Sequence, residues 1–256
     1  MTDSTRPSSG RARALAGGAS LIVLLAAWEA ASLAIGKEII LPSPARVLAV
    51  AISLYPTPPF LSDLWATFLR GLAAFGLSAG LGIAAGLASG RRPIFGAMLA
   101  PILTVIRATP VLALVLIALL WFPSGFVPIF TAFLMAFPIM ATSAAEGALA
   151  TDPRLLEMAR LFRVPERELF LKLRLPSAAP HLLSGAKNAL GLSWKVVVAG
   201  EILCQPTRAL GTGMQDSRLL LESASVFAWA VAAVALCGLT EWALGLAARK
   251  AARHGL

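Results

Sequence analysis

Residues 71–90 read GLAAFGLSAGLGIAAGLASG, a stretch of 20 residues without a charged side chain. An α-helix rises about 1.5 Å per residue, so this stretch covers the hydrocarbon core of a bilayer, which is about 30 Å thick. Gly82, Gly86 and Gly90 recur every fourth residue. They share one helix face, where they allow a second backbone to approach closely. The stretch predicts a spanning helix that packs tightly on a neighbour, and packing is favoured over a gating role for the glycines.

The composition of the whole chain agrees with a membrane protein. Of its 256 residues, 58% are hydrophobic and only 14% are charged, which is too little charge to cover a soluble domain. The net charge is +9. The basic residues lie in short segments between apolar runs, a pattern typical of bacterial inner-membrane proteins and not of nucleic-acid-binding proteins. We expect an all-α integral protein of the bacterial inner membrane, in contact with the lipid bilayer and with no nucleic-acid partner.

Helix breakers and polar segments divide the chain into six predicted transmembrane helices. The predicted spans cover residues 14–36, 64–90, 94–122, 126–145, 181–203 and 223–248. Pro110 is expected to kink the third span, because it removes a backbone hydrogen bond. A short surface helix is expected after Pro44, and residues 205–222 are expected to form a polar loop. The first span is expected to remain uncleaved, since no small-residue cleavage site follows it.

The distribution of Lys and Arg predicts the orientation of these spans. With the N-terminus inside, fourteen Lys and Arg fall in inside segments and four fall in outside segments. Basic residues accumulate on the cytoplasmic side of membrane proteins. We therefore predict a cytoplasmic tail over residues 1–13, a six-span domain over residues 14–248 and a second cytoplasmic tail over residues 249–256.

The inside segment of residues 146–180 is charged and amphipathic. Asp152 is a plausible N-cap with Pro153 at the first helical position, and a second helix start follows at Pro165. Glu166 and Glu168 lie in the first turn of that second helix, where negative charge is favourable. The apolar face of the first helix contains Leu155, Leu156, Ala159 and Phe162. These patterns predict two short helices in an L, which either pack on the protein's own spans or dock a soluble partner.

This segment resembles the "EAA" loop of bacterial ABC importer permeases. The family pattern is Glu-Ala-Ala, three residues, Gly, nine residues, Ile, one residue and Leu-Pro, and the spacing here fits without a gap. The matching positions are Glu157, Ala159, Leu175 and Pro176. The chain departs from the pattern at Met158, at Leu173 and at Arg163, which stands where the family usually has Gly. Arg tolerates a positive φ poorly, so the turn between the two helices is expected to differ from the turn that Gly would form.

The wider chain, from about residue 20 to residue 248, is similar to the nitrate, sulfonate and taurine branch of these permeases. The resemblance is carried by Trp28-Glu29, by LPSP at residues 41–44, by RATP at residues 107–110 and by LSWKVVVAGE at residues 192–201. It implies a type I importer fold, a permease dimer, a separate ABC ATPase pair and an external solute-binding protein. A single permease per system is common in this branch, so the resemblance implies a homodimer.

The resemblance also implies which residues act in transport. The sequence has no phosphate-binding Gly-x-x-x-x-Gly-Lys-Ser/Thr loop, so ATP hydrolysis is expected in the partner chain, with no catalytic residue, cofactor or metal here. The coupling helix of about residues 152–175 would sit in a groove of the ATPase. The candidate coupling residues are Asp152, Leu155, Glu157, Met158, Ala159, Leu161, Phe162, Arg163, Leu175 and Pro176.

Polar residues inside the predicted spans are candidates for the translocation path. They are Arg107, Trp194, Lys195 and Glu201. Buried ionisable groups in a membrane are costly and usually face a cavity or a partner. Lys195 either attracts a small anion in transit, or pairs with a carboxylate or extends toward the membrane surface. The alternatives to an importer subunit are a secondary transporter or channel, which would leave the docking loop unexplained, and a membrane-embedded enzyme, for which no catalytic motif occurs.

Overall fold

The computed structural model describes residues 10–253, and every regular element within them is helical. In chain order the helices are α1 (Gly10–Ile35), α2 (Pro44–Leu54), α3 (Pro58–Arg91), α4 (Pro93–Ala108), α5 (Val111–Ala118), α6 (Val127–Leu149), α7 (Pro153–Leu161), α8 (Glu166–Leu169), the π-helical segment η1 (Phe170–Arg174), α9 (Leu175–Cys204), α10 (Leu210–Leu219) and α11 (Ser223–Arg253). The predicted all-α class is confirmed. Of the predicted tails, residues 1–9 and 254–256 lie outside the described residues, whereas residues 10–13 belong to α1 and residues 249–253 to α11.

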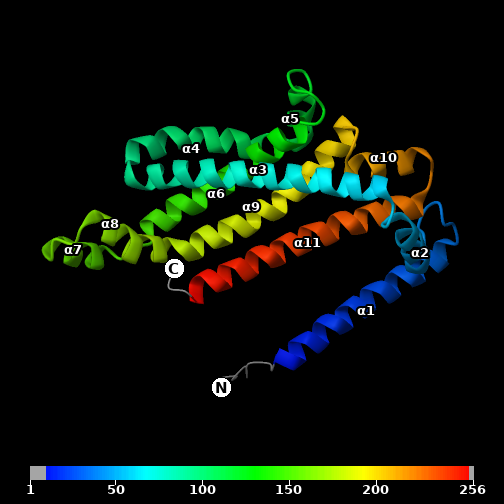
Figure 1. Cartoon of the computed structure of the whole chain (residues 1–256), viewed down its shortest axis with the longest axis horizontal. Coiled ribbons are helices and arrows are strands. Elements are labelled where there is room, and N and C mark those ends of the chain that lie inside the picture. Colours follow the sequence, from blue (N-terminus) through cyan, green and yellow to red (C-terminus); the bar gives the residue numbers. More distant parts are fainter. Residues whose placement is uncertain (1–9, 254–256) are drawn as a thin grey trace.

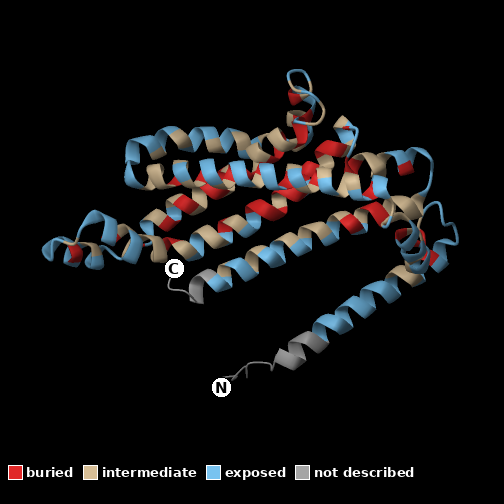
Figure 2. Cartoon of the chain, viewed as in Figure 1, coloured by how far each residue is buried: buried red, intermediate tan, exposed pale blue. Residues whose placement is uncertain are grey.

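The core of the molecule is formed by α3, α6 and α9, which pack side by side (Figure 1). The glycine stripe of α3 faces α6. A Cβ added at Gly82 would lie 2.5 Å from the Cβ of Met140, and one added at Gly90 would lie 2.6 Å from the Cβ of Ala148. Buried residues gather along α6 and α9 in the middle of the bundle (Figure 2). The close packing predicted for the stripe is confirmed.

The third predicted span is broken rather than kinked. α4 ends at Ala108, α5 begins at Val111, and the two helices are bent by 94° relative to each other. Thr109 and Pro110 between them have extended backbone, with ψ of 127° and 130°. Pro110 lacks a backbone N–H and disfavours the helical conformation of the residue before it, so Thr109 leaves the helix. α4 folds back along α3 after the break at Arg92, and α5 leaves the direction of α4 because of the break at Thr109 and Pro110 (Figure 1).

Two further boundaries differ from the prediction. The fifth span does not begin at residue 181, because α8, η1 and α9 follow one another without a break from Glu166 to Cys204. Pro176 is tolerated in the first turn of α9, and Pro180 lies inside the helix. Residues 205–222 are not a simple polar loop, since they contain α10. A Cβ at Gly213 of α10 would overlap Trp229 of α11, so close packing stabilises this short helix.

Helix α1 extends away from the core and is anchored near its C-terminal end (Figure 1). The Trp28 Nε1 donates to the Pro42 carbonyl at 3.0 Å, and the Ser32 hydroxyl donates to the Leu41 carbonyl at 2.9 Å. The Trp28 ring also contacts the Phe227 ring of α11, with centroids 5.5 Å apart. Residues 16–27 of the helix are exposed and uncharged (Figure 2).

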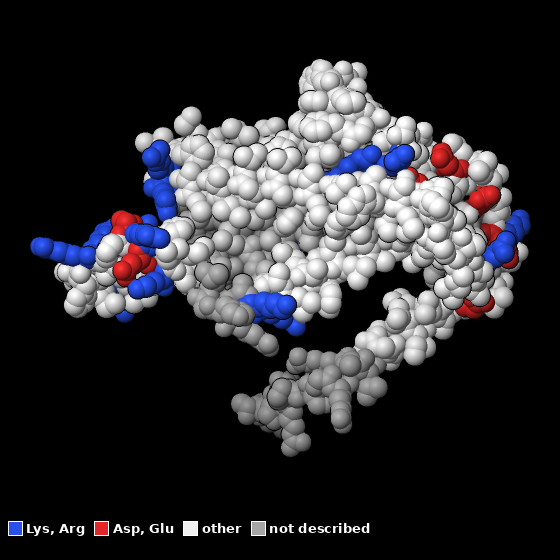
Figure 3. Space-filling model, in the orientation of Figure 1, with Lys and Arg blue, Asp and Glu red and all other residues white. Residues whose placement is uncertain are grey.

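Among the described residues, four helices are long and apolar enough to cross a membrane, or up to five if the bent pair α4–α5 is one span. The predicted span that is not among these is the fifth, which lies in α9; this helix is 30 residues long but contains Lys187, Lys195 and Glu201. The charged side chains gather mainly at two ends, one formed by α7 and α8 and the other by α2 and α10 (Figure 3). The mostly uncharged surface between these ends is the part that fits a bilayer.

Candidate functional site

Helix α7 is a nine-residue helix with a defined start at the charged end of the bundle. The Asp152 side chain caps it by accepting a hydrogen bond of 2.9 Å from the Arg154 backbone N–H. Pro153 occupies the first turn, where its missing N–H leaves no hydrogen bond unmade. The predicted N-cap is therefore present, and the helix begins at one definite residue.

The C-terminal end of α7 is closed by a Schellman motif, with Arg163 in the left-handed conformation. The Val164 N–H donates to the Ala159 carbonyl at 2.9 Å, and the Arg163 N–H donates to the Arg160 carbonyl at 3.0 Å. Arg163 has a φ of 49°. A Cβ strains the backbone in this conformation, which accounts for the Gly at this point of the family pattern quoted above.

One side of α7 is apolar and exposed. Leu161 and Phe162 are 83% and 77% exposed, and Leu155 and Met158 are also exposed. Glu157 lies on the exposed surface beside them. Ala159 is instead 8% exposed, because its side of the helix packs on the rest of the chain. The exposed edge formed by Leu155, Glu157, Met158, Leu161 and Phe162 is called the docking edge below.

Leu175 and Pro176 do not lie on this edge. They are half-buried in the first turn of α9, where the π-helical segment joins it. The Leu175 N–H donates to the Phe170 carbonyl, five residues earlier, so η1 contains one residue more per turn than an α-helix. These two residues of the sequence motif therefore belong to the connection between α7 and the bundle.

The four residues predicted for the translocation path do not form one site, although Trp194 and Lys195 line the same hollow. Arg107 joins α4 to α6, because its guanidinium donates to the Pro138 carbonyl at 3.0 Å and to the Thr142 hydroxyl. Trp194 is 2% exposed and packs against Gly71 of α3. Lys195 is exposed and lines a hollow of about 570 Å³ between α9 and α11, together with Cys237 and Glu241. Within residues 16–250, Lys195 forms no ion pair.

Glu201 lies inside the protein, in a polar network at the end opposite α7. Its side chain is 0% exposed and forms an ion pair of 2.8 Å with Arg70 of α3. Its carboxylate also accepts from the Thr67 hydroxyl at 2.9 Å and from the Gly211 N–H at 3.2 Å. Glu201 is thus fully hydrogen-bonded and joins α3, α9 and α10.

Arg70 and Thr67 were not identified as functional candidates from the sequence. The Arg70 guanidinium also donates to the Gly125 and Arg208 carbonyls, at 3.2 and 2.7 Å, and Thr67 accepts from the Leu210 N–H at 2.9 Å. One usable signal was present, since Arg70 and Glu201 are opposite charges inside two apolar helices and such charges usually pair.

Comparison with known proteins identifies the family of the chain. The family described as "binding-protein-dependent transport system inner membrane component" matches residues 76–253, which is more than half of the chain. A protein of Brucella melitensis named Probable ABC transporter permease protein is 28% identical over 190 residues, covering 74% of this chain and 77% of that protein.

Two relatives carry more specific names. The taurine transport system permease protein of Escherichia coli is 28% identical over 237 residues, covering 90% of this chain and 85% of that protein. The nitrate import permease protein of a Synechocystis species is 29% identical over 197 residues, covering 72% of this chain and 70% of that protein. The resemblance to ABC importer permeases is confirmed, and the chain belongs to the family of binding-protein-dependent transport system inner membrane components.

Proposed function

We propose that this chain is the permease subunit through which an ABC importer moves a small anionic solute across the bacterial inner membrane. Two copies would form the channel, a separate ATPase pair would bind the docking edge, and a solute-binding protein would deliver the solute at the opposite end. The spans would number six, with both termini in the cytoplasm. The orientation is supported by the excess of basic residues in the inside segments.

The observation that carries this proposal is the docking edge of α7. Leu161 and Phe162 are large apolar side chains, yet they project from the charged end of the bundle, away from its core. Burying one such side chain against a partner contributes roughly 1.5–3 kcal/mol. An apolar helix edge with a carboxylate beside it is suited to a groove in a soluble protein.

Helix α7 is also placed to transmit a movement. The chain continues from it through a short turn into α8, η1 and α9, which run unbroken to the polar network of Glu201. A closing ATPase pair would draw two copies of α7 together. The bundles would respond as rigid bodies and expose the path on the other side of the membrane.

The solute class is inferred from relatives and from charge. Two relatives are named for taurine, which carries a sulfonate group, and for nitrate. In this chain Arg107 and Lys195 place positive charge within the largely uncharged part of the bundle, and such charges commonly mark a solute path. A small solute that carries an anionic group fits both observations.

The decisive experiment is a pull-down of the ATPase with the full-length chain from detergent-solubilised membranes. The test variant combines Glu157→Arg with Phe162→Asp. The control combines Glu222→Arg with Leu220→Asp, which makes the same chemical changes at exposed positions of the opposite end. We expect the ATPase to co-purify with the wild type and the control, and to be reduced at least tenfold with the test variant.

Two outcomes would contradict the proposal. If the folded wild-type chain retains no ATPase under any nucleotide condition, the chain does not act as a subunit of an ATP-driven importer. If both double variants lose the ATPase equally, the contact is not made by α7.

A further inference from the structure

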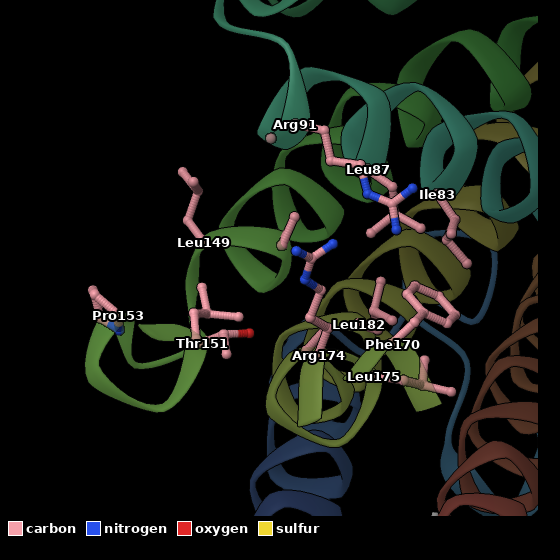
Figure 4. A pocket seen from close by; sticks show the side chains of 14 residues that line it. Ile83, Leu87, Arg91, Leu149, Thr151, Pro153, Phe170, Arg174, Leu175 and Leu182 are labelled. Carbon is pink, nitrogen blue, oxygen red and sulfur yellow. The ribbon is translucent and has the colours of Figure 1, made fainter. Parts of the chain in front are cut away.

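A cavity of about 530 Å³ lies behind α7, where the ends of α3, α6 and α9 meet the α7–α8 segment. This volume is within the range of roughly 300–1,000 Å³ that is typical of small-molecule sites. Residues of α3, α6, α7, η1 and α9 line it, and Figure 4 shows Arg91, Phe170, Arg174 and Leu182 around one space. The docking edge lies on exposed residues of α7 that do not line this cavity.

Two arginines bring positive charge into the cavity. Arg91 at the end of α3 and Arg174 of η1 both line it, and their guanidinium groups point into the space between the helices (Figure 4). Arg91 lies over the Phe170 ring, 5.4 Å from its centroid, and forms no ion pair within residues 16–250. Arg174 has one carboxylate neighbour, Glu166 at 3.6 Å, whose side chain is 79% exposed and therefore weakly bound.

Positive side chains outnumber negative ones around the cavity. A second hollow adjoins the cavity and is lined by Arg91, Arg174, Phe170, Glu166 and Arg167. Three arginines therefore surround the opening against one exposed glutamate. Guanidinium groups in this arrangement are suited to a phosphate group, which they bind with paired hydrogen bonds.

A buried hydroxyl lines the same cavity without a hydrogen-bond partner. Thr151 is 5% exposed, and its Oγ1 has no partner among the described residues. Figure 4 shows this oxygen directed into the cavity, on the side of Arg174. Leaving a buried polar group unpaired costs free energy, so a ligand that accepts from this hydroxyl would remove that cost.

The remaining walls are apolar. Ile83, Leu87, Leu156, Leu175 and Leu182 line the cavity. A free phosphate ion would gain nothing from these walls, whereas a molecule with a phosphate at one end and a hydrocarbon chain at the other would use both parts of the site. The lining residues place the cavity at the α7–α8 end of the bundle, where charged side chains border the mostly uncharged surface (Figure 3). A bilayer that covers the uncharged surface would place its headgroups at this end.

We propose that this cavity binds one anionic phospholipid, with the phosphate held by Arg91, Arg174 and the Thr151 hydroxyl and one acyl chain lying against Leu87 and Leu182. The bound lipid would then pack against the inner side of α7. The proposal concerns the inner side of the α7–α8 segment and does not depend on which solute is transported or on which partner binds the docking edge.

The test is lipid titration of the purified full-length chain in detergent, followed by native mass spectrometry. The probes are phosphatidylglycerol, phosphatidylcholine with the same acyl chains, and inorganic phosphate as a competitor. The test variant combines Arg91→Gln with Arg174→Gln. The control combines Arg92→Gln with Arg249→Gln, which removes the same charge at exposed positions that do not line the cavity.

We expect the wild type and the control to bind one phosphatidylglycerol in preference to phosphatidylcholine, and the test variant to bind it about tenfold more weakly or worse. Thr151→Val keeps the shape of the side chain and removes only the hydroxyl. It is expected to raise the Kd for phosphatidylglycerol about threefold or more and to leave the melting temperature unchanged or higher, which separates binding from folding.

Three results would overturn the proposal. Equal loss of phosphatidylglycerol in both double variants would mean that only the net charge matters. Displacement of the lipid by millimolar inorganic phosphate would identify a free-anion site. Exclusion of the lipid when the ATPase assembles on the chain would mean that a protein segment occupies the cavity.

Discussion

Arg163 holds the turn after α7 in a conformation that its side chain disfavours. With a φ of 49° it lies in the left-handed region, where a non-glycine residue costs about 1–2 kcal/mol. The two Schellman hydrogen bonds around it compensate for that cost. Arg163 also adds a positive charge at the tip of the segment, so the departure from Gly changes both the stability and the charge of the α7–α8 turn.

We predict that Arg163→Gly stabilises this turn by up to about 1 kcal/mol, and that the β-branched Arg163→Val destabilises it by about 1–2 kcal/mol. The measurement is hydrogen exchange at the Val164 amide, which donates to the Ala159 carbonyl. Exchange should be slower than in the wild type for the Gly variant and faster for the Val variant. Equal exchange in all three proteins would show that the turn carries no strain.

The Arg70–Glu201 pair gives a second prediction at a single site. Arg70→Met leaves the buried Glu201 carboxylate without its cation, and we expect a loss of about 3–5 kcal/mol in stability. Adding Glu201→Gln removes the buried charge but still allows hydrogen bonds from Thr67 and Gly211, so the double variant should recover part of the loss. Thermal unfolding in detergent measures both. A double variant less stable than Arg70→Met alone would contradict this account.

The α3–α6 contact explains why the glycines of α3 are not equivalent. A Cβ at Gly86 would overlap the Ala141 carbonyl and lie 2.6 Å from the Ala144 Cβ, whereas a Cβ at Gly80 would meet nothing within 4 Å. We predict that Gly86→Ala lowers the stability by about 1–3 kcal/mol through overpacking. Gly80→Ala in the same helix should raise it by up to about 1 kcal/mol, since Ala favours helix. Melting temperatures that shift in the same direction for both variants would refute the packing model.

At the level of elements, the sequence predicted helices better than their ends. The apolar runs identified α3, α6 and α11, because a bilayer requires long uncharged helices and leaves few alternatives. Pro110 indicated that the third span is not a straight helix, but a proline does not determine the angle between the two halves. The 94° bend depends on how α4 packs along α3. The fifth span was predicted to begin at residue 181, yet the helix already includes Pro176 and Pro180. α10 was missed because its stability comes from close contacts with Trp229 and Glu201.

The candidate site could be predicted in part. Asp152 and the apolar residues of α7 were visible in the sequence, since a capped amphipathic helix has a local pattern. The burial of Ala159, and the separation of Leu175 and Pro176 from the docking edge, depend on contacts distant in sequence. The same reason applies to Glu201. Its charge within an apolar helix suggested a path residue, and only the fold brings Arg70 and Thr67 to it.

For the whole molecule, the separation of charge into two ends leads to a topology prediction (Figure 3). Single cysteines at Phe162 and Leu220, both exposed and at opposite ends, would be introduced after Cys204 and Cys237 are replaced by Ser. A membrane-impermeant maleimide should label the cysteine at position 220 in intact spheroplasts, and the one at position 162 only after the membrane is opened. The reverse pattern would place α7 outside and exclude its contact with a cytoplasmic ATPase.

The π-helical segment between α8 and α9 determines how far the docking edge is rotated relative to the bundle. One residue of an α-helix corresponds to a rotation of about 100° and a rise of about 1.5 Å. The hydrogen bond from the Leu175 N–H to the Phe170 carbonyl marks one extra residue in η1. This residue rotates the α7–α8 segment by about 100° relative to α9, compared with a continuous α-helix. Removing one residue here would turn Leu161 and Phe162 toward a different direction without altering either side chain. The direction in which the docking edge points is therefore a property of one backbone turn outside the edge itself.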